Sequence, residues 1–355
     1  MGMKKSDKSV TLMDVAKRAG VGVGTASRVL NKDPRVKEST KQAVHQAMAD
    51  LNYKPNSVAR GLKTGMSKTF GVIVSDITSS FFSKIIKGIE ATSAENQYSF
   101  MMANTDMNPD KVTDAIRLMG EKMVEGIFLL GEIVTVDIIE QLERMDIPVV
   151  LVSMNIPMIG KGLPKNFASV SINNERAAFC AVDYMCSIGC RKIAMLMTDM
   201  DDQNVGKARY DGYRKALKAH GIQHEDCLVI SGDLSMESGY DCMKRLLDDG
   251  IVPDAVFAAS DYAAFGAMRL LHERKIRIPE DISVIGFDGV EQGKYSYPSL
   301  TTINQPRYQM GKVGMQLMMD MIQKKEILNR EVLLQYEFNE RESCLKKAED
   351  TGNQG

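Results

Sequence analysis

The stretch VTLMDVAKRAGVGVGTASRVLN, residues 10–31, decides how the chain begins to fold. Thr11 and Asp14, three positions apart, have the arrangement of a capping box, which opens a helix. Residues 19–22, AGVG, form a glycine connection so short that it is typical of a tight corner between two helices. A second helix is predicted over residues 23–30. The stretch therefore indicates a helix-turn-helix.

A third helix, predicted over Ser39–Leu51, allows the apolar residues of all three helices to close a miniature core. The second helix presents side chains that can reach phosphates or base edges. These are Thr25, Ser27, Arg28 and Asn31.

Charge is divided unevenly along the chain. Residues 1–70 carry 14 Lys and Arg against 5 Asp and Glu, whereas the remaining 285 residues carry 31 against 41. A basic head on an acidic body is typical of a polyanion-binding module attached to a domain with another task.

From Thr69 onward, apolar runs alternate with amphipathic segments. The runs are continuous rather than alternating, as in FGVIV and SVIGF, which indicates strands buried on both faces. The predicted strands are 69–76, 99–105, 126–131, 149–154, 192–198, 227–231, 255–260, 282–287 and 300–304. The predicted helices between them are 83–96, 109–123, 136–144, 175–188, 209–220, 237–248, 263–274 and 307–325. This alternation predicts doubly wound parallel sheets in an α/β core, and the number of strands indicates two lobes that divide near residues 169–173.

Several function classes are disfavoured. The chain has no apolar run of eighteen residues and no apolar leader at its N-terminus, so we expect a cytoplasmic protein without membrane contact. The six cysteines lack a C-x-x-C pair and nearby metal-ligand partners, so we expect reduced cysteines and no metal. No nucleotide-binding or hydrolase motif occurs in its required context, so we expect no catalytic residues and no cofactor.

The motifs together resemble the lactose-repressor/galactose-repressor (LacI/GalR) family. The head and the segment LNYKPNSVARGLK, residues 51–63, are similar to that family's DNA-binding head and hinge. FGVIVSDITSSFFSKIIKGIE, ASDYAAFGAMRLL, IPEDISVIGFD and YPSLTTINQP stand in the family's order in the body. The resemblance covers essentially residues 10–343.

The resemblance implies a domain plan. Residues 1–52 would form the helix-turn-helix domain, 53–67 a hinge helix and linker, and 68–343 a two-lobed, periplasmic-binding-protein-like core for effector binding and dimerisation. Lobe 1 would comprise about 68–168 and 302–330, and lobe 2 about 169–301 and 331–343. Residues 344–355 would be a tail; it lacks a leucine heptad, which favours a homodimer over a tetramer.

The resemblance also implies a set of DNA contacts to a pseudo-palindromic double-stranded operator. Leu62 would wedge into a base step from the minor groove, unless it is an ordinary linker residue. Gly24, at a position that usually reads bases, has no side chain, and Val23 is left to contact a thymine methyl. The DNA-contacting set is Thr11, Val23, Gly24, Thr25, Ser27, Arg28, Asn31, Thr40, Tyr53, Asn56, Ala59 and Leu62.

An effector site between the lobes is implied in the same way. Aromatic faces would stack on a sugar or a base, while carboxylates and a guanidinium would bind hydroxyls. The effector set is Ser75, Phe81, Phe82, Gln203, Arg209, Ser260, Asp261, Asp288 and Gln305. Asp288 follows a predicted strand at its carboxyl end, where open α/β sheets bind ligands, although it could instead be a cap or turn residue.

Three alternatives remain. An enzyme is disfavoured because the glycines at 20, 22 and 24 follow a helix rather than a strand. A sugar-binding transport protein fits the body but not the basic head. A regulator that answers to a phosphorylated partner, such as a phosphocarrier protein, is the alternative to the expected regulator that answers to a sugar or a related metabolite.

Overall fold

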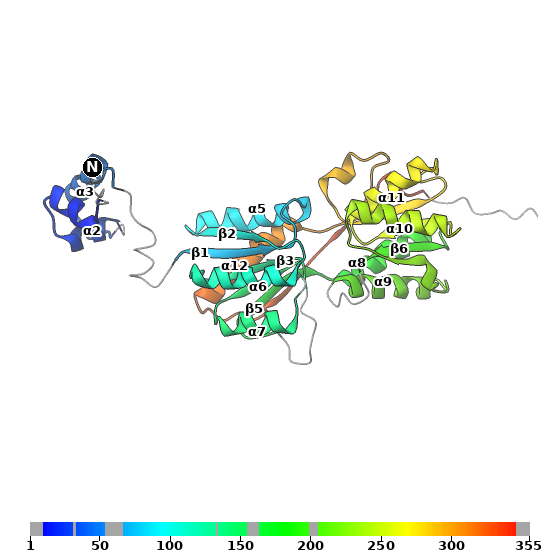
Figure 1. Ribbon diagram of the computed structural model, residues 1–355, viewed down its shortest axis with the longest axis horizontal. Coiled ribbons are helices and arrows are strands. Elements are labelled where there is room, and N and C mark those ends of the chain that lie inside the picture. Colours follow the sequence, from blue (N-terminus) through cyan, green and yellow to red (C-terminus); the bar gives the residue numbers. More distant parts are fainter. Residues whose placement is uncertain are drawn as a thin grey trace, which may run out of the picture. The chain divides into compact units, whose positions relative to one another are not determined.

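The computed structural model describes residues 10–30, 33–53, 67–132, 134–154, 163–198 and 205–345. The chain divides into two compact units, Met1–Ser67 and Lys68–Gly355. Figure 1 shows a small helical head and a core with two α/β lobes. The predicted hinge helix falls in residues 54–66, which lie outside the described residues.

Three helices build the head: α1 (Leu12–Arg18), α2 (Val23–Leu30) and α3 (Glu38–Asp50). The predicted capping box at Thr11 and Asp14 is confirmed, with each residue bonding the backbone of the other. Buried apolar side chains from all three helices form the head's own core. They are Val15, Ala16, Ala26, Val29, Val44 and Ala47.

The first lobe contains a six-stranded sheet in the order β11-β5-β4-β3-β1-β2, and all its strand pairs are parallel. Helices α5 and α12 pack on each other, and α12 also contacts β4 and β5, while α6 contacts α7 and β1. The strands are β1 (Thr69–Val74), β2 (Ser99–Asn104), β3 (Ile127–Leu130), β4 (Val149–Val152), β5 (Phe167–Ile172) and β11 (Glu331–Leu334). The helices are α5 (Ser80–Glu95), α6 (Pro109–Glu121), α7 (Val136–Arg144) and α12 (Arg307–Ile322).

The second lobe contains a six-stranded sheet in the order β12-β10-β9-β8-β6-β7. Helices α8 and α9 form one packed pair and α10 and α11 another. The strands are β6 (Ile193–Met197), β7 (Val229–Ser231), β8 (Ala255–Ala258), β9 (Ser283–Asp288), β10 (Thr301–Asn304) and β12 (Glu337–Asn339). The helices are α8 (Asn174–Ser187), α9 (Val205–Ala219), η1 (Asp226–Leu228), α10 (Met236–Asp248), α11 (Asp261–Glu273) and η2 (Glu291–Lys294). None of the described helices is both long and apolar enough to cross a membrane.

The structure corrects the predicted lobe boundaries. Strand β5 extends the first lobe to Ile172 instead of about 168, and β11 returns residues 331–334 to it. Strand β10 places residues 302–304 in the second lobe, not the first. The predicted boundaries differ from the observed ones because a segment belongs to the lobe whose strand it pairs with. The local sequence does not reveal that pairing.

The prediction of parallel sheets in an α/β core is confirmed, with one antiparallel pair in the second lobe, where β12 runs antiparallel to β10. Strands β5, β11 and β12 were not predicted. Strands β11 and β12 are short and lie at the ends of their sheets, which gives them a weak apolar signal. The predicted strand 227–231 begins instead with the 3₁₀ turn η1.

Gly88 and Gly311 let α5 and α12 approach closely in the first lobe. A Cβ atom at Gly88 would lie 2.2 Å from the carbonyl oxygen of Tyr308, and one at Gly311 would lie 2.1 Å from that of Ile85. Backbone atoms cannot yield as a flexible side chain can, so a side chain at either position forces the helices apart.

We predict that Gly88→Ala lowers the free energy of unfolding by about 1–3 kcal/mol through overpacking. Gly120→Ala in α6 is the matched control, since its Cβ would meet only Met145 at 3.6 Å. Urea unfolding followed by circular dichroism measures both. Equal stability of the two variants would contradict the close approach.

Candidate functional site

The exposed side of α2 is the candidate nucleic-acid surface. Ala26 and Val29 face the head's core, which leaves Val23, Gly24 and Arg28 exposed and Thr25 and Ser27 half-buried. Arg28 Nε donates to the carbonyl oxygen of Gly24, 3.3 Å away, one turn earlier. The side chain thus lies along the exposed side of the helix.

The other predicted head residues hold positions around this helix. Thr11 is occupied as the cap of α1, where its hydroxyl donates to Asp14 Oδ2 at 2.7 Å. Thr40 is half-buried in the first turns of α3, and Tyr53 is half-buried against the head's core. Asn31, Asn56, Ala59 and Leu62 lie outside the described residues.

Asp288 is the last residue of β9, at the carboxyl edge of the second sheet. Its φ of 119° is a conformation that residues with a side chain rarely adopt, and it costs on the order of 1–3 kcal/mol. Gln305 Nε2 donates to Asp288 Oδ1 at 2.8 Å, and Arg209 Nη2 lies 3.8 Å from the same oxygen. Burial raises the pKa of Asp288 to about 6, against the lowering effects of Arg209, Arg307 and Gln305.

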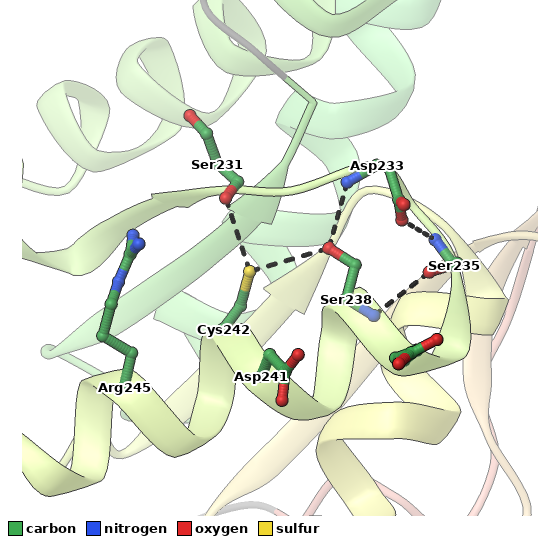
Figure 2. A pocket seen from close by; sticks show the side chains of 8 residues that line it. Ser231, Asp233, Ser235, Ser238, Asp241, Cys242 and Arg245 are labelled. Carbon is green, nitrogen blue, oxygen red and sulfur yellow. Dashed lines mark hydrogen bonds between the residues drawn. The ribbon is translucent and has the colours of Figure 1, made fainter. Parts of the chain in front are cut away.

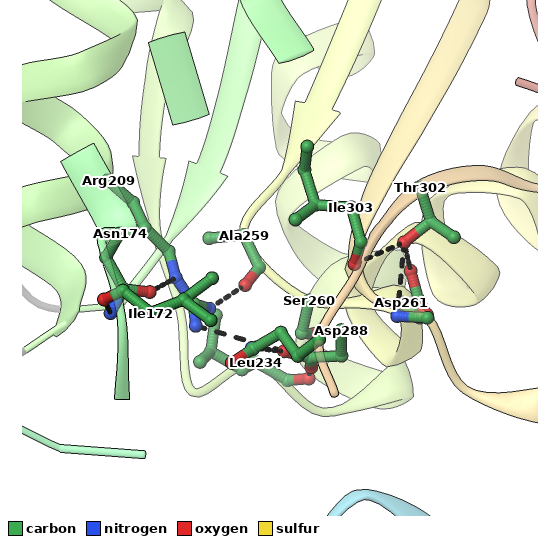
Figure 3. Close-up of polar contacts among 12 residues, drawn as sticks. Ile172, Asn174, Arg209, Leu234, Ala259, Ser260, Asp261, Asp288, Thr302 and Ile303 are labelled. Atoms are coloured by element: carbon green, nitrogen blue, oxygen red, sulfur yellow. Dashed lines mark hydrogen bonds and ion pairs between the residues drawn. The ribbon is translucent and has the colours of Figure 1, made fainter. Parts of the chain in front are cut away.

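Arg209 of α9 is held on several sides, as Figure 3 shows. Its Nε donates to Asn174 Oδ1 at 3.1 Å, and its Nη1 donates to the carbonyl oxygen of Ala259 at 2.5 Å. The guanidinium carbon lies 3.8 Å from the ring centroid of Phe287. A guanidinium fixed in this way is preorganised to bind a ligand's oxygen atoms beside Asp288.

Two polar atoms beside Asp288 lack a hydrogen-bond partner. In the described part of the chain, three buried side-chain atoms are in this state: Ser283 Oγ, Gln305 Oε1 and Arg307 Nε. Gln305 and Arg307 flank Pro306, where the chain passes from β10 to α12 and so between the lobes. An unsatisfied buried acceptor and donor at one crossover are what a bound polar molecule could satisfy.

Asp261, also predicted to contact the effector, forms its hydrogen bonds inside the second lobe. Its carboxylate is fully buried and accepts from the backbone N–H of Val290 at 2.7 Å and from Thr302 Oγ1 at 2.5 Å. Both oxygens are thus used inside the second lobe, where they hold the loop after Asp288. Burial, together with the charge of Asp288, raises the pKa of Asp261 to about 8.

Ser260 also has a local role in the structure. It caps α11 by accepting from the N–H of Ala263, and its hydroxyl donates to the carbonyl oxygen of Leu234 at 2.7 Å. Gln203 lies outside the described residues.

The predicted residues of the first lobe gather at the carboxyl edge of its sheet. Phe81 is buried and Phe82 half-buried at the start of α5, with ring centroids 5.1 Å apart. Phe82 lies against Gly131, where a Cβ would be 2.2 Å from the ring and 2.9 Å from Ser75 Oγ. Ser75, Phe82 and the end of β3 are therefore neighbours.

The sequence analysis did not identify several buried residues at the carboxyl edges of the two sheets. The Arg209–Asp288 pair is also contacted or surrounded by Asn174, Phe287 and Arg307. The only sequence signal for these residues is their position at the end of a strand or the start of a helix. Glu132, two residues after β3, is also buried, and its carboxylate accepts from Thr105 Oγ1 at 2.7 Å. Burial raises the pKa of Glu132 to about 7.

A separate open pocket of about 370 Å³ lies on the second lobe, where β7 meets α10 (Figure 2). It is lined by Ser231, Asp233, Ser235, Glu237, Ser238, Asp241, Cys242 and Arg245. None of the residues predicted from sequence lines it. Within the described ranges, no group of three His, Cys, Asp or Glu residues could hold a metal ion.

Comparison with protein families matches both units. Residues 11–56 match the bacterial regulatory proteins of the lacI family, and residues 182–344 match a periplasmic binding protein-like domain. The chain is 33% identical over 337 residues to the HTH-type transcriptional regulator RegA of Clostridium saccharobutylicum, covering 95% of this chain and all of RegA. It is 36% identical to the HTH-type transcriptional regulator MalR of Clostridium butyricum, covering 95% of this chain and 99% of MalR.

Solved structures agree. The lac repressor dimer bound to operator and the anti-inducer ONPF has a TM-score of 0.82 at 27% identity, covering 95% of this chain and 100% of that one. The complex of the regulator CelR with cellobiose has a TM-score of 0.72 at 29% identity, covering 94% and 99%.

A helix-turn-helix head followed by a two-lobed α/β core defines the class of DNA-binding transcriptional regulators with an effector-binding domain. The chain belongs to the lacI family of bacterial regulatory proteins.

The buried carboxyl of Asp261 predicts a pH dependence of core stability. Because its pKa of about 8 in the folded core exceeds the ordinary value of 3.8, the folded state binds this proton more tightly than the unfolded state. The stability it contributes is complete below the ordinary pKa and is lost as pH rises through about 8. Asp261→Asn removes the titrating carboxyl and should reduce the loss of unfolding free energy between pH 6.5 and 8.5, measured by urea titration.

The control is Asp249→Asn, since Asp249 is exposed directly after α10 in the second lobe. It should keep the wild-type pH dependence. If Asp261→Asn kept it as well, Asp261 would be ionised throughout this range and the cause would lie elsewhere.

Proposed function

We propose that this regulator is a repressor that binds a pseudo-palindromic operator as a homodimer and is controlled by a small polyhydroxylated molecule at the lobe crossover. The exposed side of α2 supports the operator contact, since Arg28 and Ser27 there can reach phosphates or base edges. The lac repressor dimer bound to operator, which has the same fold, supports the homodimer.

The buried cluster around Asp288 carries the effector assignment. It combines an oriented guanidinium at Arg209, a carboxylate at Asp288 and the unpartnered acceptor Gln305 Oε1 at the carboxyl edge of a parallel sheet. A hydroxyl group can donate to the carboxylate or amide oxygen and accept from the guanidinium. This favours a sugar or a related polyol, and CelR, which binds cellobiose, has the same fold.

The aromatic pair of the first lobe fits the same ligand. Phe81 and Phe82 lie at the start of α5, and the neighbouring Ser80 contacts the second lobe through Tyr262. An aromatic face offers an apolar surface to a sugar ring, while the second lobe supplies its hydrogen bonds. A ligand that touches both lobes can change how they are arranged, which is how occupancy would reach the head.

For the head, we predict that Arg28→Ala weakens operator binding by about 1–3 kcal/mol, because it removes a base or phosphate contact. The operator is first selected from a pool of random duplexes, and affinity is measured by fluorescence anisotropy across a salt series. Arg144→Ala in α7 removes the same charge from the core and should leave affinity unchanged. An equal effect of the two variants would mean that only net charge matters.

For the core, we predict that Asp288→Ala weakens effector binding by about 1–3 kcal/mol or more, since it removes the carboxylate that would accept a hydrogen bond from the ligand. A thermal-shift screen of monosaccharides, disaccharides and purine bases identifies a ligand, which should add about 2.7 kcal/mol at a hundred times its dissociation constant. Calorimetric titration of that ligand then compares wild type, Asp288→Ala and Asp288→Asn, which keeps the side-chain shape.

Asp226→Ala, on the exposed surface, is the control and should bind as wild type does. Unchanged affinity in both Asp288 variants would make this carboxylate a turn residue only. If no sugar or base bound, while a phosphorylated carrier protein altered operator affinity, the small-molecule assignment would be replaced by protein control.

A further inference from the structure

Three side chains connect the lobes directly. Ser80 is the first residue of α5 in the first lobe, whereas Tyr262 in α11 and Gln292 in η2 belong to the second. The backbone N–H of Ser80 donates to Tyr262 Oη at 3.0 Å, and the Tyr262 hydroxyl donates to Ser80 Oγ at 2.9 Å. The Ser80 hydroxyl donates in turn to Gln292 Oε1 at 3.1 Å. Each hydroxyl hydrogen is used once, so all three bonds form together.

These residues adjoin the predicted effector residues. Ser80 directly precedes Phe81, Tyr262 directly follows Asp261, and Gln292 lies four residues after Asp288. Only one to four peptide units separate the candidate effector residues from the residues that form the interlobe bonds. A shift of the backbone at the candidate site therefore also shifts those bonds.

A second interlobe contact ends on the same short loop, residues 288–292. Arg307, the first residue of α12 in the first lobe, donates through Nη2 to the carbonyl oxygen of Gly289 at 2.5 Å. The loop is fixed inside the second lobe as well, because the N–H of Val290 donates to Asp261 Oδ2 at 2.7 Å. Both connections from the first lobe thus converge on the loop that follows Asp288.

We propose that Ser80, Tyr262 and Gln292 form an interlobe latch, which acts with Arg307 to hold the loop 288–292 and the two lobes in one arrangement. Ser80 and Tyr262 are half-buried and Gln292 is exposed, so water competes for these bonds and the latch can open reversibly. A ligand on Asp288 would bias it through the loop; only this last step rests on the proposed function.

The test is hydrogen exchange of the full chain, without DNA or ligand, in wild type and Tyr262→Phe. The variant removes the hydroxyl and keeps the ring, which packs edge-on against Phe265 at 6.3 Å between centroids. Amide exchange should accelerate about tenfold in peptides that begin several residues before Ser80 and so include its amide, and also in peptides that cover residues 288–293. Ser80→Ala, which loses the two hydroxyl bonds but keeps the amide bond, should accelerate the 288–293 peptides as well.

Tyr240→Phe is the matched control, because its hydroxyl bonds Glu273 at 2.7 Å entirely within the second lobe. It should leave both sets of peptides as in wild type. Acceleration confined to the Ser80 amide, with residues 288–293 unchanged in both latch variants, would reduce the contact to a local cap and overturn the latch. Since the measurement needs neither effector nor operator, this result is independent of whether the proposed function holds.

Discussion

The buried pair of Asp288 and Arg209 is the constraint around which the core is organised. Two ionic groups removed from water must be compensated, and breaking such a pair typically costs about 3–5 kcal/mol. The compensation comes from separate parts of the chain: Asn174 and the Ala259 carbonyl for Arg209, and Gln305 for Asp288. Strands β8, β9 and β10 and helices α8 and α9 must therefore be in place together before the pair is satisfied.

Parallel topology explains why these groups can meet at all. In a parallel sheet every strand delivers its following loop to the same edge, so Ala259, Asp288 and Gln305, which are far apart in sequence, become neighbours. The first sheet does the same for Ser75, Thr105 and Glu132. With chain crossovers after β5, β10 and β11, both edges belong to one folding unit.

The head is stabilised by a small core of its own and by contacts at its periphery. Its six buried residues make a core too small to tolerate much loss, and capping at Thr11 and the Arg18–Asp50 bond at 2.9 Å support it from the periphery. The outer side of α2 does not contribute to this core. The packing residues and the exposed residues of α2 thus lie on opposite sides of one helix, so the exposed residues can vary without disturbing the fold.

The sequence by itself determined the helix-turn-helix, the helix cap at Thr11, and the buried strands with long apolar runs, because these depend on local periodicity and capping. It also indicated Arg209, Asp288 and Gln305, which the structure brings together. Only the tertiary structure decided that β5 and β11 join the first sheet, that β12 runs antiparallel, that Asp261 is enclosed by Thr302 and Val290, and that Arg307 and Tyr262 contact the opposite lobe. The physical reason is that sheet membership, burial and contacts across lobes depend on residues that are distant in the chain. A local sequence pattern does not specify which distant segment will pack against it.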